Sequence, residues 1–210
     1  MFKNTLSQKA KATLALLGKS KCLPVGSYLT GGSALALHFG HRISVDFDFF
    51  TPNSFIQEKV AKELMSIGKF VVEQITKDTL LGNFENIRFS LFRYDYPLLF
   101  QTIDLYGIKI ATPCDIAPMK LAAIMDRGTK KDFIDLYFII KNEIPLETCL
   151  KYYDKKYQAL ANNIYSIITS LSYFVDAENT VIPKMLKNVT WEEIRTFFER
   201  ESIRLGKKYL

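Results

Sequence analysis

Hydrophobic and polar residues follow two different patterns along the chain, and the change falls near Pro113. Up to this point, short runs of β-branched and aromatic residues alternate with amphipathic segments, which is typical of a mixed α/β arrangement. The pattern predicts helices over 3–19, 34–39 and 55–67, and strands over 25–30, 44–50, 70–76, 87–94 and 98–110. Leu81-Gly82-Asn83 and Tyr96-Pro97 are predicted to be turns between strands.

From Thr112 onward the hydrophobic period is helical. Thr112-x-x-Asp115 and Thr129-x-x-Asp132 resemble capping boxes with Asp in place of Glu, and Thr190-x-x-Glu193 matches the motif fully. The first two predict a pair of helices that meet at Arg127-Gly128. One or two helices are expected over 146–175 and a last one up to about residue 205. The fold class is therefore α/β (α+β), with a mixed half over residues 1–111 and an all-helical lobe over 112–210.

Composition and charge narrow the class of protein. The chain has 210 residues, of which 48% are hydrophobic, and this excludes a disordered protein. Its net charge of +6 favours polyanionic partners such as nucleotides or RNA. The three cysteines show no CxxC spacing, which indicates neither a disulfide framework nor a zinc site. No apolar run is long enough for a membrane span or a secretory signal, so we expect a cytoplasmic protein without a membrane partner.

Two carboxylates, Asp46 and Asp48, interrupt a strand of valine and phenylalanine. Alternate residues of a strand share a face, so the two side chains project together about 7 Å apart. An ionised carboxylate among apolar residues is costly unless it is paired or binds a metal. Hard oxygen ligands at this separation suit Mg²⁺, which takes the rest of its shell from water and substrate phosphates. We therefore expect a magnesium site for phosphoryl transfer. The alternative is that the two carboxylates have no role in a site and only face solvent or pair with Arg42.

The turn Gly31-Gly32-Ser33 precedes these carboxylates by about a dozen residues. Ser33 is expected to cap the helix over 34–39, and backbone N–H groups at a helix start bind phosphate well. Glycine lets a phosphate approach the backbone closely. Together the turn and the carboxylates predict a site for a nucleoside triphosphate with magnesium. Alone, each motif is weak, because a Gly-Gly-Ser segment is often only a turn.

Three stretches resemble a known family. These are Gly31–Leu37, His41–Phe50 and Asp115–Tyr137, which resemble the AbiEii/AbiGii abortive-infection nucleotidyltransferases of the polymerase-β-like superfamily. The resemblance covers about residues 26–141. It implies a small mixed sheet flanked by helices, Mg²⁺, an NTP donor such as GTP or CTP, and an acceptor such as RNA or tRNA. It also implies the toxin of a type IV toxin–antitoxin system for phage defence, with a winged-helix antitoxin that acts without stable binding.

The resemblance implies further site residues. The superfamily uses a third carboxylate on a later strand, and Asp104 has the apolar flanks that such a position needs, whereas Asp95 resembles a turn residue. On the first helix of the second half, Lys120 and Arg127 fall on one face and are candidates to hold the triphosphate. The remaining candidates are two aspartates one helical turn apart and two cations, namely Asp132, Asp135, Lys131 and Arg42. Asp132 is also the expected capping partner of Thr129, and Asp135 could pair with Lys131.

Two other functions stay open at this point. A small-molecule or antibiotic nucleotidyltransferase would use the same metal chemistry on another acceptor. A non-catalytic nucleotide-binding partner of a regulator would need the glycine turn but not every carboxylate. The presence of Asp46, Asp48 and a candidate third carboxylate favours an enzyme. No Ser or Cys nucleophile in a recognisable setting accompanies His38 or His41, so both histidines are expected to be structural.

Overall fold

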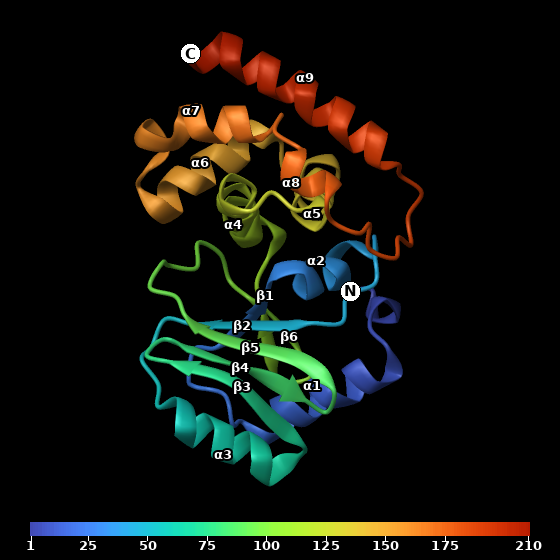
Figure 1. Cartoon of the computed structure of the whole chain (residues 1–210). Coiled ribbons are helices and arrows are strands. Elements are labelled where there is room, and N and C mark those ends of the chain that lie inside the picture. Colours follow the sequence, from blue (N-terminus) through green and yellow to red (C-terminus); the bar gives the residue numbers. More distant parts are fainter. The chain divides into compact units, whose positions relative to one another are not determined.

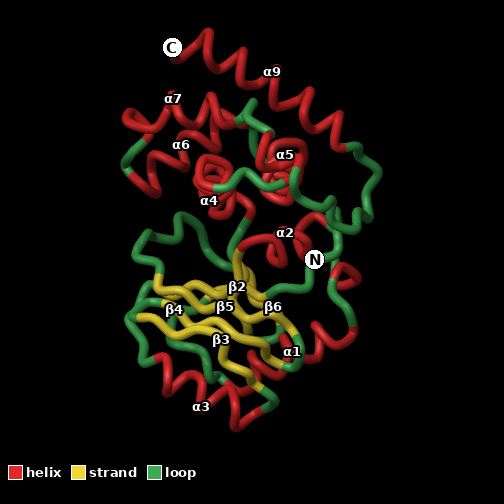
Figure 2. Tube along the Cα trace, viewed as in Figure 1, coloured by secondary structure: helices red, strands yellow, loops and turns green.

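The computed structural model describes residues 1–210, and the chain divides into two compact units, Met1–Thr112 and Pro113–Leu210. All strands belong to the first unit, whereas the second unit consists of helices and loops (Figure 2). Each unit is described separately below.

The first unit contains a seven-stranded mixed sheet in the order β3-β4-β5-β2-β1-β7-β6 (Figure 1). The strands are β1 (Tyr28–Thr30), β2 (Phe47–Thr51), β3 (Phe70–Thr76), β4 (Thr79–Phe84), β5 (Ile87–Arg93), β6 (Ile103–Leu105) and β7 (Ile108–Ile110). β2 lies at the centre, antiparallel to β1 and parallel to β5. The central position of β2 places its side chains between those of two neighbouring strands.

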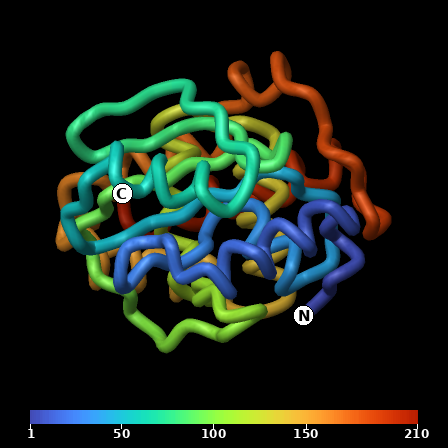
Figure 3. The backbone as a smooth tube through the Cα atoms, turned by 90° about the horizontal axis from the view of Figure 1, so that it is seen from below, coloured from blue at the N-terminus to red at the C-terminus, as the bar shows by residue number.

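The two faces of β2 differ in chemistry. Phe47 and Phe49 are fully buried on one face, where Phe49 packs against Phe89 with 5.5 Å between ring centroids. Helices α1 (Gln8–Ser20) and α3 (Gln57–Ile67) lie across this side of the sheet (Figures 1 and 3). Burial of each phenylalanine contributes roughly 2–3 kcal/mol. Asp48 and Phe50 point to the opposite face, which carries α2 (Gly31–Phe39).

Helix α2 begins three residues earlier than expected. Thr30 is its N-cap and makes no side-chain capping bond, so the prediction that Ser33 caps the helix is wrong. Ser33 instead lies in the first turn, where its hydroxyl is available for other contacts. The helix ends at Gly40, whose φ of +65° is the left-handed C-cap conformation that glycine favours.

Two strand predictions also need correction. Leu81-Gly82-Asn83 is not a turn but the middle of β4, where a Cβ on Gly82 would approach the Val71 carbonyl oxygen to 2.4 Å. Glycine here permits close approach of the neighbouring strand, so the local turn signal was misleading. The expected strand over 98–110 is instead the hairpin β6–β7, which reverses at Tyr106-Gly107.

The second unit comprises helices around an aromatic core. They are α4 (Pro113–Asp126), α5 (Lys130–Asn142), α6 (Leu146–Tyr157), α7 (Leu160–Ser170), α8 (Val175–Glu178) and α9 (Trp191–Tyr209). The ring of Phe133 contacts those of Phe174, Trp191 and Phe198 at 5.1–5.9 Å. The capping box of Thr190 and Glu193 at the start of α9 is confirmed. None of the helices in the chain combines the length and apolar character that a membrane span requires.

Candidate active site

Gly31 and Asp48 bring the glycine turn and the carboxylate strand together. Thr30 on β1 is the register partner of Asp48 on β2, so the next residue, Gly31, starts α2 beside the carboxylate. A Cβ built on Gly31 would lie 3.0 Å from Oδ2 of Asp48, and the φ of Gly31 is +66°. The absence of a side chain on Gly31 therefore provides the space that the carboxylate occupies.

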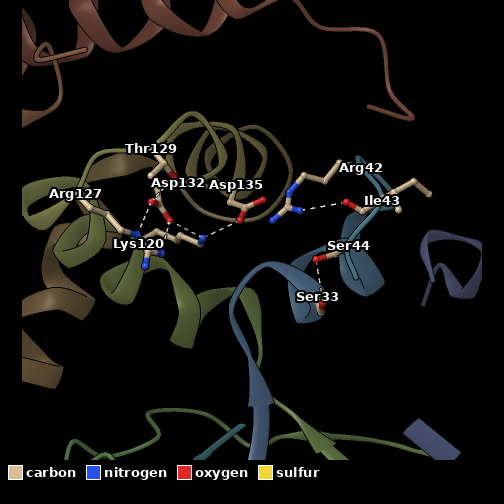
Figure 4. Close-up of polar contacts among 9 residues, drawn as sticks. All are labelled: Ser33, Arg42, Ile43, Ser44, Lys120, Arg127, Thr129, Asp132 and Asp135. Carbon is tan, nitrogen blue, oxygen red and sulfur yellow. Dashed lines mark hydrogen bonds and ion pairs between the residues drawn. The ribbon is translucent and has the colours of Figure 1, made fainter. Parts of the chain in front are cut away.

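Ser33 connects the first turn of α2 to the segment before β2. Its hydroxyl donates to the backbone carbonyl of Asp46 and is 2.9 Å from Oγ of Ser44 (Figure 4). These bonds fix the backbone of Asp46 relative to α2. The serine of the motif thus positions the first carboxylate residue.

Gly32 lies against the guanidinium of Arg42. A Cβ on Gly32 would come within 2.1 Å of Nη2 of Arg42, while Nη1 of Arg42 donates to the Ile43 carbonyl at 3.2 Å (Figure 4). The structure therefore places a cation at the start of α2, on the segment that leads to Asp46. Positive charge at this position favours an anionic ligand at the helix N-terminus.

Asp104 does not join Asp46 and Asp48, contrary to the expectation of a third ligand. It lies on the edge strand β6, which β1 and β7 separate from β2, a distance of about 14 Å at the usual strand spacing. Its carboxylate is 52% exposed, pairs with Lys109 at 3.2 Å and accepts from the Gly107 N–H at 3.0 Å. On β5, the neighbour of β2, the register partner of Asp48 is Ser90 rather than a carboxylate. Asp95 is a surface residue bonded to Arg93.

The donor set of this unit fits magnesium that is completed by a substrate. No group of three or more Asp, Glu, His and Cys side chains lies close enough to hold a metal by itself. Mg²⁺ is commonly bound by one or two carboxylates, with water and substrate phosphates in the other positions. Asp48, which lies beside Gly31, and Asp46, which lies in the segment just before β2, could supply such a partial set.

In the second unit, Lys120 of α4 is bound by two aspartates of α5. Its Nζ lies 2.9 Å from Oδ1 of Asp132 and 2.8 Å from Oδ2 of Asp135 (Figure 4). The side chains of Asp132 and Asp135 are 1% and 0% exposed, and that of Lys120 is 8% exposed. If these side chains moved apart, each would be a buried charge without compensation, which is strongly destabilising. The two carboxylates and the ammonium are therefore expected to form a rigid group.

Asp132 also binds Arg127 and Thr129. Arg127 donates through Nε and Nη2 at 3.0 and 3.2 Å, and the Thr129 hydroxyl donates at 2.7 Å. Burial alone would raise the pKa of Asp132, but Lys120, Arg127 and Thr129 together hold that pKa well below its usual range. Arg127 itself remains 62% exposed. The carboxylate thus holds a buried cation and a surface cation at one place.

Two expectations for this helix pair change. The Thr129 side chain does not cap the backbone of α5 but donates to the Asp132 carboxylate. The ion pair of Asp135 is with Lys120 rather than with Lys131, which is exposed. Lys120 and Arg127 both bind Asp132, although Arg127 lies one residue beyond the end of α4.

The sequence pattern missed a second buried pair, Lys156 of α6 with Asp115 of α4. The atoms Nζ and Oδ1 are 3.2 Å apart and both side chains are fully buried. Burial lowers the pKa of Lys156, and Asp115 partly offsets this effect. A row of aromatic rings beside Asp48, formed by Phe50, Phe92, Tyr94 and Tyr96, was also missed. The period-two spacing of Asp48 and Phe50 on β2 was the signal that could have indicated it. His38 bonds through Nε2 to the Ala111 carbonyl at 2.9 Å, which fits a structural role.

Comparison with known proteins identifies a family over most of the chain. Residues 25–104 and 87–208 match the family model described as the nucleotidyl transferase AbiEii toxin of type IV toxin–antitoxin systems. An uncharacterized protein of Aquifex aeolicus (strain VF5), aq_aa25, is 41% identical over 180 residues, which cover 83% of this chain and 85% of that protein.

Solved structures with the same fold are more distant in sequence. A candidate nucleotidyltransferase from H. pylori has a TM-score of 0.58 at 18% identity, with 96% of each chain covered. MenT4, a nucleotidyltransferase toxin from Mycobacterium tuberculosis H37Rv, has a TM-score of 0.55 at 17% identity, with 95% of this chain and 89% of that chain covered. At this identity the similarity establishes the shared fold alone.

Proposed function

Because the chain belongs to the AbiEii family of nucleotidyltransferase toxins, we propose that it transfers a nucleoside monophosphate from an NTP to a hydroxyl of RNA, with tRNA as the first candidate. The observation that carries this proposal is the contact of Gly31 with the Asp48 carboxylate. This contact supports the proposal because backbone N–H groups at the start of α2 could bind phosphate while the neighbouring carboxylate could hold Mg²⁺ for the same triphosphate.

Different residues of the first unit have different roles in the proposed transfer. The backbone N–H groups at the start of α2 and the Arg42 guanidinium bind the phosphates that leave as pyrophosphate. Ser33 holds the backbone of Asp46 against the first turn of α2. Magnesium held by these two carboxylates would neutralise charge on the phosphates. In the transfer, the acceptor oxygen bonds to the α-phosphorus and the bond from that phosphorus to the bridging oxygen breaks. Pyrophosphate leaves with the bond's electron pair, and the hydroxyl proton passes to water.

In the helical unit we assign Lys120 and Arg127 to binding of the triphosphate, and Asp132 and Asp135 to positioning these cations. The support is the shared carboxylate of Asp132, which fixes both cations, and the exposure of Arg127. A preorganised cation stabilises charge that develops on a leaving group more effectively than a mobile one. Lys131 is exposed and makes no contact with this group, so we leave it out of the assignment.

The toxin role extends the proposal to partners. We propose a cognate winged-helix antitoxin that acts without stable binding, a cytoplasmic site of action and a function in phage defence. Induced expression should slow growth, coexpression of a cognate antitoxin should restore it, and the Asp48→Asn variant should have no effect on growth. Growth arrest by Asp48→Asn equal to that by the wild type would contradict a catalytic toxin.

The acceptor can be identified by following label. The protein with Mg²⁺ is incubated with each α-labelled NTP in turn, starting with GTP and CTP, and with total RNA, cell protein extract or aminoglycosides. We expect label on RNA, and we expect transfer to weaken as salt rises because RNA binding releases counterions. Label on an aminoglycoside alone would favour an antibiotic nucleotidyltransferase. NTP binding without transfer to any acceptor would favour a non-catalytic partner of a regulator.

A further inference from the structure

A row of aromatic rings continues the carboxylate face of the sheet. Phe50 follows Asp48 by two residues on β2, so both side chains leave the same face about 7 Å apart. Phe92, its register partner on β5, lies 5.5 Å from the Phe50 ring, and Tyr94 lies 4.7 Å from it. Tyr96 is 5.1 Å from Tyr94. We call Phe50, Phe92, Tyr94 and Tyr96 the aromatic platform.

The platform and the glycine turn lie on opposite sides of Asp48. β1 and β2 are antiparallel, with Thr30 opposite Asp48 and Tyr28 opposite Phe50. The chain continues from Thr30 into Gly31, so the phosphate-binding turn extends from Asp48 toward Asp46. Phe50 extends the same face in the other direction along β2. The order along the strand is therefore phosphate turn, carboxylates, aromatic rings.

The rings of the platform remain accessible, unlike the other phenylalanines of β2. Phe47 and Phe49 are fully buried in the core. By contrast, Phe50 and Tyr94 are only partly buried, and Tyr96 is 46% exposed. Because these partly exposed rings contact one another, they form a surface on which a planar ligand could stack.

We propose that the aromatic platform stacks the terminal base of a single-stranded RNA acceptor. This inference rests on the proposed function. In an in-line displacement the attacking oxygen enters opposite the leaving group. If pyrophosphate leaves at the glycine turn, the acceptor hydroxyl must approach Asp48 from the side of Phe50. Aromatic side chains bind single-stranded bases by stacking, with little dependence on sequence.

Binding of RNA to a protein that cannot react tests the inference apart from catalysis. The background is Asp46→Asn, the probe is a short single-stranded oligoribonucleotide of mixed sequence, and affinity is measured at several salt concentrations. We expect Tyr96→Ala to weaken RNA binding about five-fold or more. The salt dependence should not change, because no phosphate contact is removed. Tyr96→Phe should bind as the parent does.

A tyrosine of the β6–β7 turn provides the matched control. Tyr106 belongs to the same unit and is 38% exposed, so Tyr106→Ala should leave RNA affinity unchanged. Equal RNA affinity of Tyr96→Ala and its parent would overturn the inference, as would an equal loss in Tyr106→Ala. A loss of NTP affinity in place of RNA affinity would assign the platform to the donor base and also overturn it. Absence of transfer by the wild type, with Tyr96-dependent RNA binding intact, would instead contradict the proposed function alone.

Discussion

Oδ2 of Asp48 occupies space that a side chain on Gly31 would need, since only 3.0 Å separates this oxygen from the ideal Cβ position. Gly31 also has a φ of +66°, a conformation that costs other residues about 1–2 kcal/mol. We therefore predict that Gly31→Ala lowers the free energy of unfolding by about this amount and lowers transfer at least ten-fold, because the methyl group displaces the carboxylate. Urea denaturation and label transfer measure the two effects.

Gly26 separates backbone strain from displacement of the carboxylate. Its φ is +84°, but a Cβ there would meet the Asn53 side chain at 3.4 Å rather than a site residue. Gly26→Ala should lose similar stability and retain its transfer rate per folded molecule. Equal losses of transfer in both variants would show that the Gly31 contact has no special role.

Removal of the Lys120 ammonium should be costly for stability. Lys120→Met leaves the buried carboxylates of Asp132 and Asp135 without their buried ammonium. Loss of one partner of a buried ion pair typically lowers the free energy of unfolding by about 3–5 kcal/mol. The double variant Lys120→Met/Asp135→Asn should recover part of the loss, because it removes one of the two buried charges. Denaturation of the three proteins in urea measures this, and a loss below about 1 kcal/mol in Lys120→Met would contradict a tightly coupled group.

The same group predicts how stability depends on pH. The pKa of Asp132 is depressed in the folded protein, whereas an unfolded aspartate titrates near pH 3.9. In acid the unfolded chain therefore binds the extra proton, and stability falls as pH decreases below about 4. Above that pH the contribution of Asp132 is fully present. Urea denaturation of Asp132→Asn between pH 3 and 6 should show a shallower acid loss than the wild type, and identical slopes would contradict the prediction.

Two neighbouring surface cations test the assignment of the triphosphate. Arg127 is bound to Asp132, whereas Lys131 is an exposed residue of α5. Arg127→Ala should raise KM for NTP about ten-fold, as expected when a fixed cation of a phosphate site is lost. Lys131→Ala should change KM less than two-fold, beyond a general effect of charge. If the two variants raise KM equally, the cations act only through net charge.

Local sequence patterns predicted the parts of the site that lie close together in the chain. Gly31, Gly32 and Ser33 lie 13 to 17 residues before Asp46 and Asp48. A strand–helix–strand unit brings the two segments together through one register. The faces of β2 follow from period-two alternation, so Phe47 and Phe49 could be assigned to the core before the structure was known.

Contacts that depend on sheet order or helix packing could not be predicted in this way. Asp104 has the local features of a site residue, but the hairpin β6–β7 joins the sheet at its edge, away from β2. Asp135 lies one turn from Lys131, yet packing of α4 on α5 pairs it with Lys120. In both cases a tertiary relationship outweighed a local pattern.

Transfer of α-labelled nucleotide by carboxylate variants tests the central claim most directly. The variants are Asp46→Asn, Asp48→Asn and, as a matched control on the edge strand, Asp104→Asn, all assayed with Mg²⁺ and total RNA. We predict that Asp46→Asn and Asp48→Asn each lose transfer at least a hundred-fold. Their Tm should be unchanged or slightly higher, because loss of one of two neighbouring carboxylates removes like-charge repulsion. Asp104→Asn should retain transfer within about two-fold, because its strand, β6, lies about 14 Å from β2. Transfer at the wild-type rate by Asp46→Asn or Asp48→Asn, or a hundred-fold loss in Asp104→Asn, would contradict the site.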